Sequence, residues 1–160
     1  METLQLIGFG GLCYVNLNAA NNNKNEQNFF IGSCLLSMGF ILRAYEFYLT
    51  EKNNVKHKLS KGHLCLALFY LISFIYPINR RHTELNIIAL VGHSLLINHN
   101  KYYNYGLLLL AIYYMIQIQE NITQNDNDSK IRTISAICIL TFYLQELKKI
   151  NLIKKKNKII

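Results

Sequence analysis

The chain has 160 residues, of which 51% are apolar and 16% charged, and it carries a formal net charge of +8. This excess of basic residues does not indicate nucleic-acid binding, because the lysines lie between apolar stretches and in the tail, where basic residues set membrane topology or contact anionic lipid headgroups. The four cysteines are widely spaced and form neither a CxxC pair nor a cluster with histidine, so the sequence predicts no metal site, no cofactor and no disulfide framework.

Apolar stretches separated by short polar breaks fill almost the whole chain and predict helices in a membrane. A helix needs about 20 apolar residues to cross the ~30 Å hydrocarbon core of a bilayer. These stretches are apolar on all sides, as expected of helices that face lipid or one another. The sequence therefore predicts an all-α bundle of six transmembrane helices in residues 1–147, with short loops, and a basic cytoplasmic tail in residues 148–160. The six stretches are residues 4–20, 29–50, 62–78, 85–97, 102–118 and 131–147.

The second stretch, residues 29–50, carries small residues at which helices can pack closely. Ser33 and Ser37 are four positions apart, and Gly32 and Gly39 lie beside them. Small residues let two backbones approach and gain van der Waals contact, which drives helix association in lipid. We expect this helix to pack through these residues on the first helix or on another subunit.

The same stretch contains two ionisable residues, Arg43 and Glu46, three positions apart on one helical face. Charged groups inside a span are costly and therefore indicate either a pairing or a function. Both residues lie within two turns of the polar break at residues 51–61, so their long side chains can reach the lipid headgroups. We expect an intramembrane ion pair that anchors the helix, with a substrate site as the alternative.

The fourth stretch, residues 85–97, is shorter than a full span and is diluted by Glu84, His93 and His99. Five spans and one re-entrant segment are therefore the alternative to six spans. His93 lies near the middle of the stretch, where we expect a buried, neutral imidazole bonded to a neighbouring hydroxyl or carbonyl group. A proton relay or a haem ligand, with His63 or His99 as the second axial ligand, are the functional alternatives.

The segment between the third and fourth stretches carries one resemblance to an enzyme family. The sequence FIYP at residues 74–77, followed by Glu84-Leu85, resembles the tyrosine-proline…glutamate segment of the 3-hydroxyacyl-CoA dehydratases of fatty-acid elongation. That family also has six spans, resides in the endoplasmic reticulum and often ends in a dilysine tail. The resemblance implies that Tyr76 and Glu84 act as a catalytic pair on a hydroxyacyl chain. The spacing between them is one residue longer here, and three apolar stretches follow Glu84 where the family has two.

The distribution of basic residues favours a cytoplasmic C-terminus. With six spans and a cytoplasmic N-terminus, the polar break at residues 51–61 and the basic tail both lie on the cytoplasmic side, in agreement with the positive-inside rule. The last five residues, KNKII, place Lys156 and Lys158 in the K-x-K-x-x form of the dilysine endoplasmic-reticulum retrieval signal. We therefore expect a multi-pass protein of the endoplasmic reticulum, with the mitochondrial inner membrane as the alternative.

Three functions are consistent with this organisation. The first is an accessory or structural subunit of a larger membrane complex, in contact with the lipid bilayer and other membrane subunits, because the loops are too short for a separate soluble site. The second is a small-solute transporter or channel with a weak 3+3 inverted repeat. The third is a lipid-modifying enzyme that uses either the pair Tyr76 and Glu84 or His93. The polar residues that would line a transport cavity are Asn16, Ser33, Ser37, His93 and Thr141.

Overall fold

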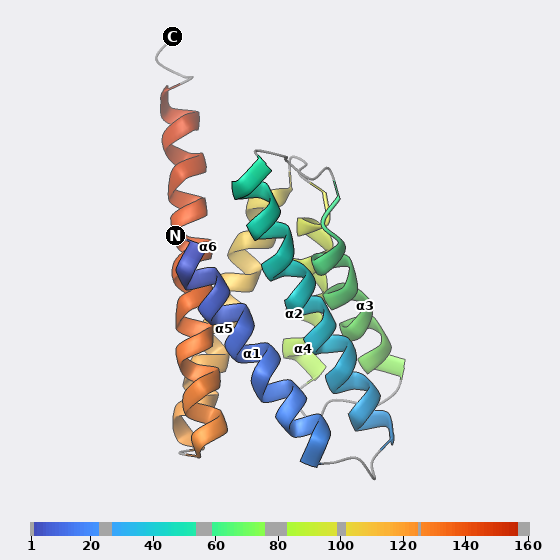
Figure 1. Ribbon diagram of the computed structural model, residues 1–160. Coiled ribbons are helices and arrows are strands. Elements are labelled where there is room, and N and C mark those ends of the chain that lie inside the picture. Colours follow the sequence, from blue (N-terminus) through green and yellow to red (C-terminus); the bar gives the residue numbers. More distant parts are fainter. Residues whose placement is uncertain are drawn as a thin grey trace.

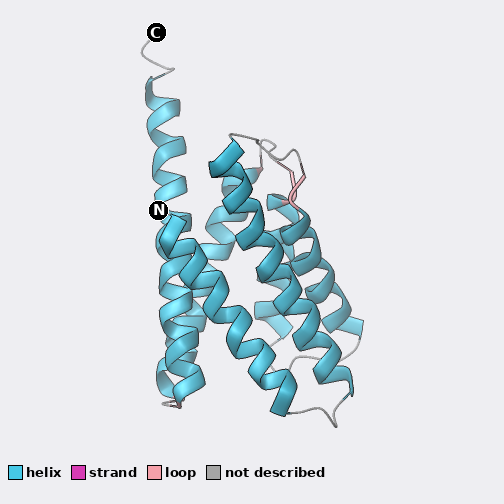
Figure 2. Ribbon diagram, in the orientation of Figure 1, coloured by secondary structure: helices cyan, strands magenta, loops and turns pink. Residues whose placement is uncertain are grey.

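The computed structural model is an almost entirely helical bundle (Figures 1 and 2), which confirms the all-α prediction. Outside the helices, the described residues contain one isolated bridge, between Leu59 and Asn98. The structure describes residues 2–22, 27–53, 59–75, 83–98, 102–124 and 126–156. The six helices are α1 (Glu2–Asn22), α2 (Gln27–Asn53), α3 (Lys61–Ile75), α4 (Thr83–Leu96), α5 (Tyr103–Thr123) and α6 (Asn127–Lys156).

The six helices form a closed ring of antiparallel neighbours. Each helix packs against the next one along the chain, and α1 also packs against α6, so the last helix completes the ring. Figure 1 shows α1 and α2 on the near side, α6 and α3 at the left and right edges, and α4 and α5 behind. No other pair of helices in the described part of the chain comes as close. Each of the six helices therefore packs against two neighbours.

Aromatic and aliphatic side chains fill the inside of the ring. Phe9 of α1 stacks on Phe40 of α2 with ring centroids 6.0 Å apart. On the other side of the bundle, Tyr114 of α5 lies 5.9 Å from Tyr143 of α6, again between ring centroids. Completely buried aliphatic residues complete this core; they include Leu66, Leu107, Leu110 and Ile139.

Glycine lets neighbouring helices approach closely at three of the six contacts. A Cβ atom at Gly39 of α2 would lie 2.6 Å from Cδ2 of Leu66 of α3. A Cβ atom at Gly92 of α4 would lie 2.7 Å from a leucine side chain of α5, and one at Gly8 of α1 would lie 2.6 Å from Ile139 of α6. A larger residue at any of these positions would force two helices apart.

The outer surface of the ring is also apolar. Every helix exposes large apolar side chains, so none has the single core-facing apolar stripe of a helix in a water-soluble bundle. Charged and polar side chains are instead buried: Arg43, Glu46, His63 and His93 are only 7%, 8%, 1% and 0% exposed. The exposed apolar residues include Tyr14 of α1, Met38 of α2, Leu68 of α3, Ile87 of α4, Leu108 of α5 and Ile134 of α6.

The described helices that are long enough to cross a membrane are not apolar enough to do so, and the most apolar helices are short. Within the described ranges, no helix is both long enough and apolar enough to cross a membrane, so the structure does not support the expected six spans. The short fourth stretch forms α4 as one continuous helix of 14 residues.

The last helix, α6, is the longest and extends beyond the rest of the bundle (Figure 1). It has 30 residues and ends at Lys156, so most of the basic segment expected as a separate tail from residue 148 continues the helix. Lysine, which is frequent in this segment, is a good helix former. The drop in hydropathy after residue 147 therefore marks the end of the apolar stretch and not the end of the helix.

Candidate functional site

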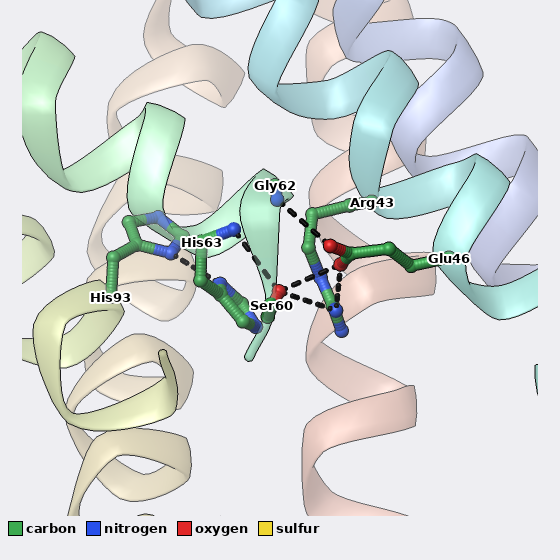
Figure 3. Close-up of polar contacts among 6 residues, drawn as sticks. All are labelled: Arg43, Glu46, Ser60, Gly62, His63 and His93. Carbon is green, nitrogen blue, oxygen red and sulfur yellow. Dashed lines mark hydrogen bonds and ion pairs between the residues drawn. The ribbon is translucent and has the colours of Figure 1, made fainter. Parts of the chain in front are cut away.

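Buried polar side chains form a network toward one end of the bundle (Figure 3). Arg43 and Glu46 come from the C-terminal half of α2, His63 from the first turn of α3 and His93 from the last turn of α4. Because neighbouring helices run antiparallel, these three parts of the chain meet at the same end. Ser60, directly before α3, connects them.

The carboxylate of Glu46 is the centre of this network. Its Oε2 accepts hydrogen bonds from Nη1 of Arg43 at 2.8 Å and from Oγ of Ser60 at 2.7 Å, and its Oε1 accepts the backbone N–H of Gly62 at 3.0 Å. Nη1 of Arg43 also donates to Oγ of Ser60 at 3.0 Å. A buried charge is tolerated only with such partners, because desolvation costs several kcal/mol per ion. The i,i+3 pair expected from the sequence thus lies inside the bundle, where it ties α2 to the start of α3.

Ser60 holds three helices together. Its Oγ accepts the backbone N–H of His63 at 3.2 Å, which is the contact of an N-cap serine. Its backbone N–H donates to the carbonyl oxygen of Ile97, just after α4, at 2.8 Å. Gly62 permits the close approach of α2, because a Cβ atom there would lie 2.6 Å from Cγ of Arg43.

His63 and His93 are hydrogen-bonded through their imidazole rings. The two Nδ1 atoms are 2.9 Å apart and the ring centroids are 5.1 Å apart. The Nε2 atom of each ring is buried and makes no hydrogen bond to any residue that the structure describes. His93 lies in the last turn of α4 and not near the middle of an apolar span. Its partner is a second histidine from the neighbouring helix and not the hydroxyl or carbonyl group that we expected.

Tyrosine and glutamine side chains continue the polar contacts toward the middle of the bundle. The ring of Tyr70 stacks on that of His93, with 5.8 Å between centroids and 12° between planes. The hydroxyl groups of Tyr70 and Tyr113 are 2.7 Å apart, and Nε2 of Gln117 donates to the same Tyr113 oxygen. Polar contacts of this kind therefore join α3 to both α4 and α5.

The two histidines have the geometry of a hydrogen-bonded pair and not of the two axial ligands of a haem. Their rings bond directly, nitrogen to nitrogen, so no haem plane fits between them as two axial histidine ligands require. Among the residues with described side chains, no group of three or more His, Cys, Asp or Glu could hold a metal ion.

Several residues singled out from the sequence cannot be placed fully. Tyr76 and Lys158 lie outside the described residues. Glu84 is in the first turn of α4 and Lys156 is the last residue of α6, but their side chains are not described. Of the three residues proposed for a lipid-modifying reaction, only His93 has a described side chain, and it is fully buried.

The residues expected to line a transport cavity do not converge on one. Nδ2 of Asn16 donates to the carbonyl oxygen of Leu12 at 2.7 Å, and Oγ1 of Thr141 donates to that of Ile137 at 2.8 Å. Each of these side chains therefore bonds to its own helix, on the α1 and α6 side of the ring, and neither reaches His93.

The small residues of α2 face two neighbouring helices. Gly32, Ser33 and Ser37 are buried, and Oγ of Ser37 donates to the carbonyl oxygen of Ser33 at 2.8 Å and lies 3.5 Å from that of Cys13 of α1. Gly39 contacts α3 through Leu66. The stretch that was expected to pack on one helix or on another subunit thus packs on both of its neighbours in the ring.

An apolar groove of about 360 Å³ opens on the outside of the ring between α1 and α2. Gly10 lines this groove, and a Cβ atom there would meet no other atom within 4 Å. The other lining residues are Leu6, Phe9, Cys13, Phe40, Ile41, Ala44, Tyr45 and Tyr48.

Four members of the polar network were missed from the sequence: Ser60, Tyr70, Tyr113 and Gln117. A local signal exists for each helix, because Tyr70 lies seven positions after His63, and Gln117 lies four positions after Tyr113, so each pair shares a helical face. The sequence of either helix alone does not show that this face of α3 is turned toward this face of α5.

Comparison with known proteins gives no assignment. No protein-family model matches the chain, and no curated protein or solved structure shows significant similarity to it. Its function must therefore be inferred from its own geometry and chemistry.

Proposed function

We propose that the chain is a small integral membrane protein that serves as an accessory or structural subunit of a larger membrane complex. The observation that carries this proposal is the apolar outer surface of the ring, to which all six helices contribute. Monomeric proteins in water rarely expose contiguous apolar patches larger than a few hundred Å². An outer surface of this kind is suited to lipid chains and to the helices of other membrane subunits.

The distribution of polar groups supports the membrane part of the proposal. Ionisable residues within a bilayer face the interior of a bundle and pair with one another, as Arg43 and Glu46 do. Close helix contacts through small residues, such as Gly39 against Leu66, are also typical of membrane bundles. One finding argues in the other direction, since no helix in the described ranges is both long and apolar enough to cross a membrane. The proposal rests on the ring as a whole, in which apolar side chains cover the outside while Arg43, Glu46, His63 and His93 are buried inside.

An accessory role is favoured over transport or catalysis because of what the described interior contains. Its apolar core draws on all six helices, and the polar groups at the α2–α4 end are hydrogen-bonded to one another. Connections between successive helices have at most seven residues, so no loop is large enough to form a separate domain. What remains available to other molecules is the outer surface.

The groove between α1 and α2 is the part of that surface that we assign to a partner helix. Gly10 leaves open space in it, whereas Gly8, two positions earlier, packs against Ile139 of α6. Gly8 thus lies on the face of α1 that packs against α6, whereas Gly10 lies on the face that is open to an external helix. In a bilayer, such a helix would gain van der Waals contact along an open glycine-containing groove.

The first experiment is purification of the tagged protein in a gentle detergent, followed by mass spectrometry of whatever accompanies it at equal stoichiometry. Carbonate extraction of membranes, done beforehand, should leave the protein in the pellet. A larger membrane protein at constant ratio is the expected result. A protein that carbonate releases contradicts the membrane assignment, and an extracted protein without any partner contradicts the accessory role.

A matched pair of variants tests the groove itself. Gly10→Phe should fill the groove without disturbing the ring, so the partner should be lost while the melting temperature in detergent is unchanged. Leu17→Phe, also on the exposed surface of α1 but outside the groove, is the control and should retain the partner. Equal retention of the partner by both variants would place the partner elsewhere on the ring.

A further inference from the structure

The bond between His63 and His93 fixes where protons sit on the pair. Both ring nitrogens that face each other are Nδ1, and at 2.9 Å one must carry the proton that the other accepts. In the neutral pair, one imidazole is therefore protonated on Nδ1 and the other on Nε2. The two outer nitrogens are then unlike, because one Nε2 is an acceptor and the other is a donor.

Both outer nitrogens are buried and unbonded to any described residue. A purely structural hydrogen bond between α3 and α4 would need only the two Nδ1 atoms. The pair instead presents an acceptor at one end and a donor at the other, in residues that are 1% and 0% exposed. A buried polar atom without a partner costs about 1–3 kcal/mol, so its retention calls for an explanation.

We propose that His63 and His93 form a proton-transfer pair, which passes protons inside the bundle between its outer nitrogens. This inference rests on the membrane assignment above but not on the accessory role. Imidazole is the side chain suited to such a step, because its two ring nitrogens let it accept a proton at one end and release one at the other.

The step balances as follows. A proton binds to the free Nε2 of the first imidazole, whose Nδ1 proton crosses the 2.9 Å bond to the second imidazole. The second imidazole then releases the proton from its own Nε2. One proton enters and one leaves, no heavy-atom bond changes, and the tautomers of the two rings are exchanged. Repeated transfer in one direction therefore requires the rings to reorient between passages.

Polar groups flank the pair on both sides. Toward the end of the bundle lies Ser60, which accepts the backbone N–H of His63 and donates to Glu46. Toward the middle, Tyr70 covers the face of His93 and begins the hydroxyl contact with Tyr113. The pair thus lies between a charged network and an uncharged one, in an otherwise apolar bundle.

The test is proton flux into vesicles that contain the purified full-length protein and a trapped pH-sensitive dye, driven by a potassium gradient with valinomycin. Flotation on a density gradient first establishes that the protein is inserted. The wild-type protein should acidify the vesicle interior faster than protein-free vesicles do. His63→Asn and His93→Asn should reduce the rate to that of protein-free vesicles, because asparagine reproduces the Nδ1 hydrogen bond but has no second nitrogen to relay a proton.

The controls distinguish a loss of proton transfer from a loss of folding and from a failure of the protein to insert into the membrane. The asparagine variants should still fold and melt cooperatively in detergent, since the hydrogen bond between α3 and α4 is kept. Phe9→Leu, far from the histidines in the apolar core, should leave the flux unchanged. Wild-type flux equal to that of protein-free vesicles, or undiminished flux in both asparagine variants, would overturn the proton-transfer proposal alone. Failure of the wild-type protein to float with vesicles would overturn the membrane assignment and this inference together.

Discussion

Nδ1 of His63 lies 2.9 Å from Nδ1 of His93, and this single bond joins the first turn of α3 to the last turn of α4. The two residues are 30 positions apart in the sequence. Their bond lies directly beside the buried ion pair of α2, so the polar groups of three consecutive helices form one network at the same end of the ring.

The histidine bond predicts two different tautomers in one protein. Nitrogen-15 NMR of protein labelled at histidine should show one buried ring protonated on Nδ1 and one protonated on Nε2, because a shared Nδ1–H···Nδ1 bond permits no other neutral arrangement. Spectra of His63→Asn and His93→Asn assign the two rings. Identical tautomers for both rings would contradict the bond.

The buried carboxylate of Glu46 should be costly to remove. Glu46→Ala leaves the Arg43 guanidinium buried without its counter-charge, and the loss of one partner of a buried pair costs about 3–5 kcal/mol. Unfolding by SDS titration in mixed micelles would measure this loss. The double variant Arg43→Met/Glu46→Leu removes both charges and should recover most of the stability. A double variant as unstable as Glu46→Ala would show that the pair has a role beyond mutual neutralisation.

Ser60→Ala should cost less than Glu46→Ala but should loosen the same end of the bundle. It removes the N-cap of α3, a contact worth roughly 0.5–2 kcal/mol, together with the bond to Glu46. Hydrogen exchange should therefore increase at the backbone N–H of His63. Ser73→Ala, which removes only a bond to the carbonyl oxygen of Phe69 within α3, is the matched control and should leave that amide protected.

The close contact at Gly39 predicts a steric effect that a second substitution relieves. Gly39→Ala places a methyl group against Leu66 and should destabilise the protein by about 1–3 kcal/mol, the usual cost of overpacking. Leu66→Ala makes room for it, so the double variant should be more stable than the sum of the two single effects. Gly10→Ala, which meets open space, should change the free energy of unfolding little. Additive effects at Gly39 and Leu66 would contradict direct contact.

Asp126 should make stability depend on pH at the α5–α6 turn. Hydrogen bonds from the backbone N–H and the hydroxyl group of Ser129 lower the pKa of Asp126 below its usual value. A lowered pKa means that the ionised carboxylate stabilises the folded state above the unfolded pKa, and that this contribution is lost as the pH falls through the folded pKa. Asp126→Ala should therefore lower the melting temperature at pH 7, with a difference that disappears in acid. Asp126→Asn, which can still cap α6, should show a smaller loss at pH 7.

The local features of the fold were predictable, and its long-range pairings were not. Six helices follow from apolar stretches interrupted by polar breaks, and the spacing of Arg43 and Glu46 predicts that they pair on one face of a helix. The contact of His63 with His93 depends on how α3 and α4 are rotated about their axes. Helices that are apolar all round carry no stripe that would reveal this rotation.

The end of the last helix was placed too early for a related reason. Apolar character ends near residue 147, but helix formation depends on backbone propensity as well as on hydropathy, and α6 continues to Lys156. Tyr70 and Gln117 were missed because tyrosine and glutamine are common on any helix surface. Only the three-dimensional structure shows that both residues bond to the hydroxyl group of Tyr113.

Closure of the ring by α1 and α6 sets an order for assembly during synthesis. The charged and histidine groups of α2, α3 and α4 are all present once residue 97 has been made, whereas the face of α1 at Gly8 and Gly11 receives α6 only after α6 has been made. Until then, the ring cannot close, and this face of α1 has no helix packed on it. A chaperone or partner helix that recognises the face would therefore act only before α6 is in place.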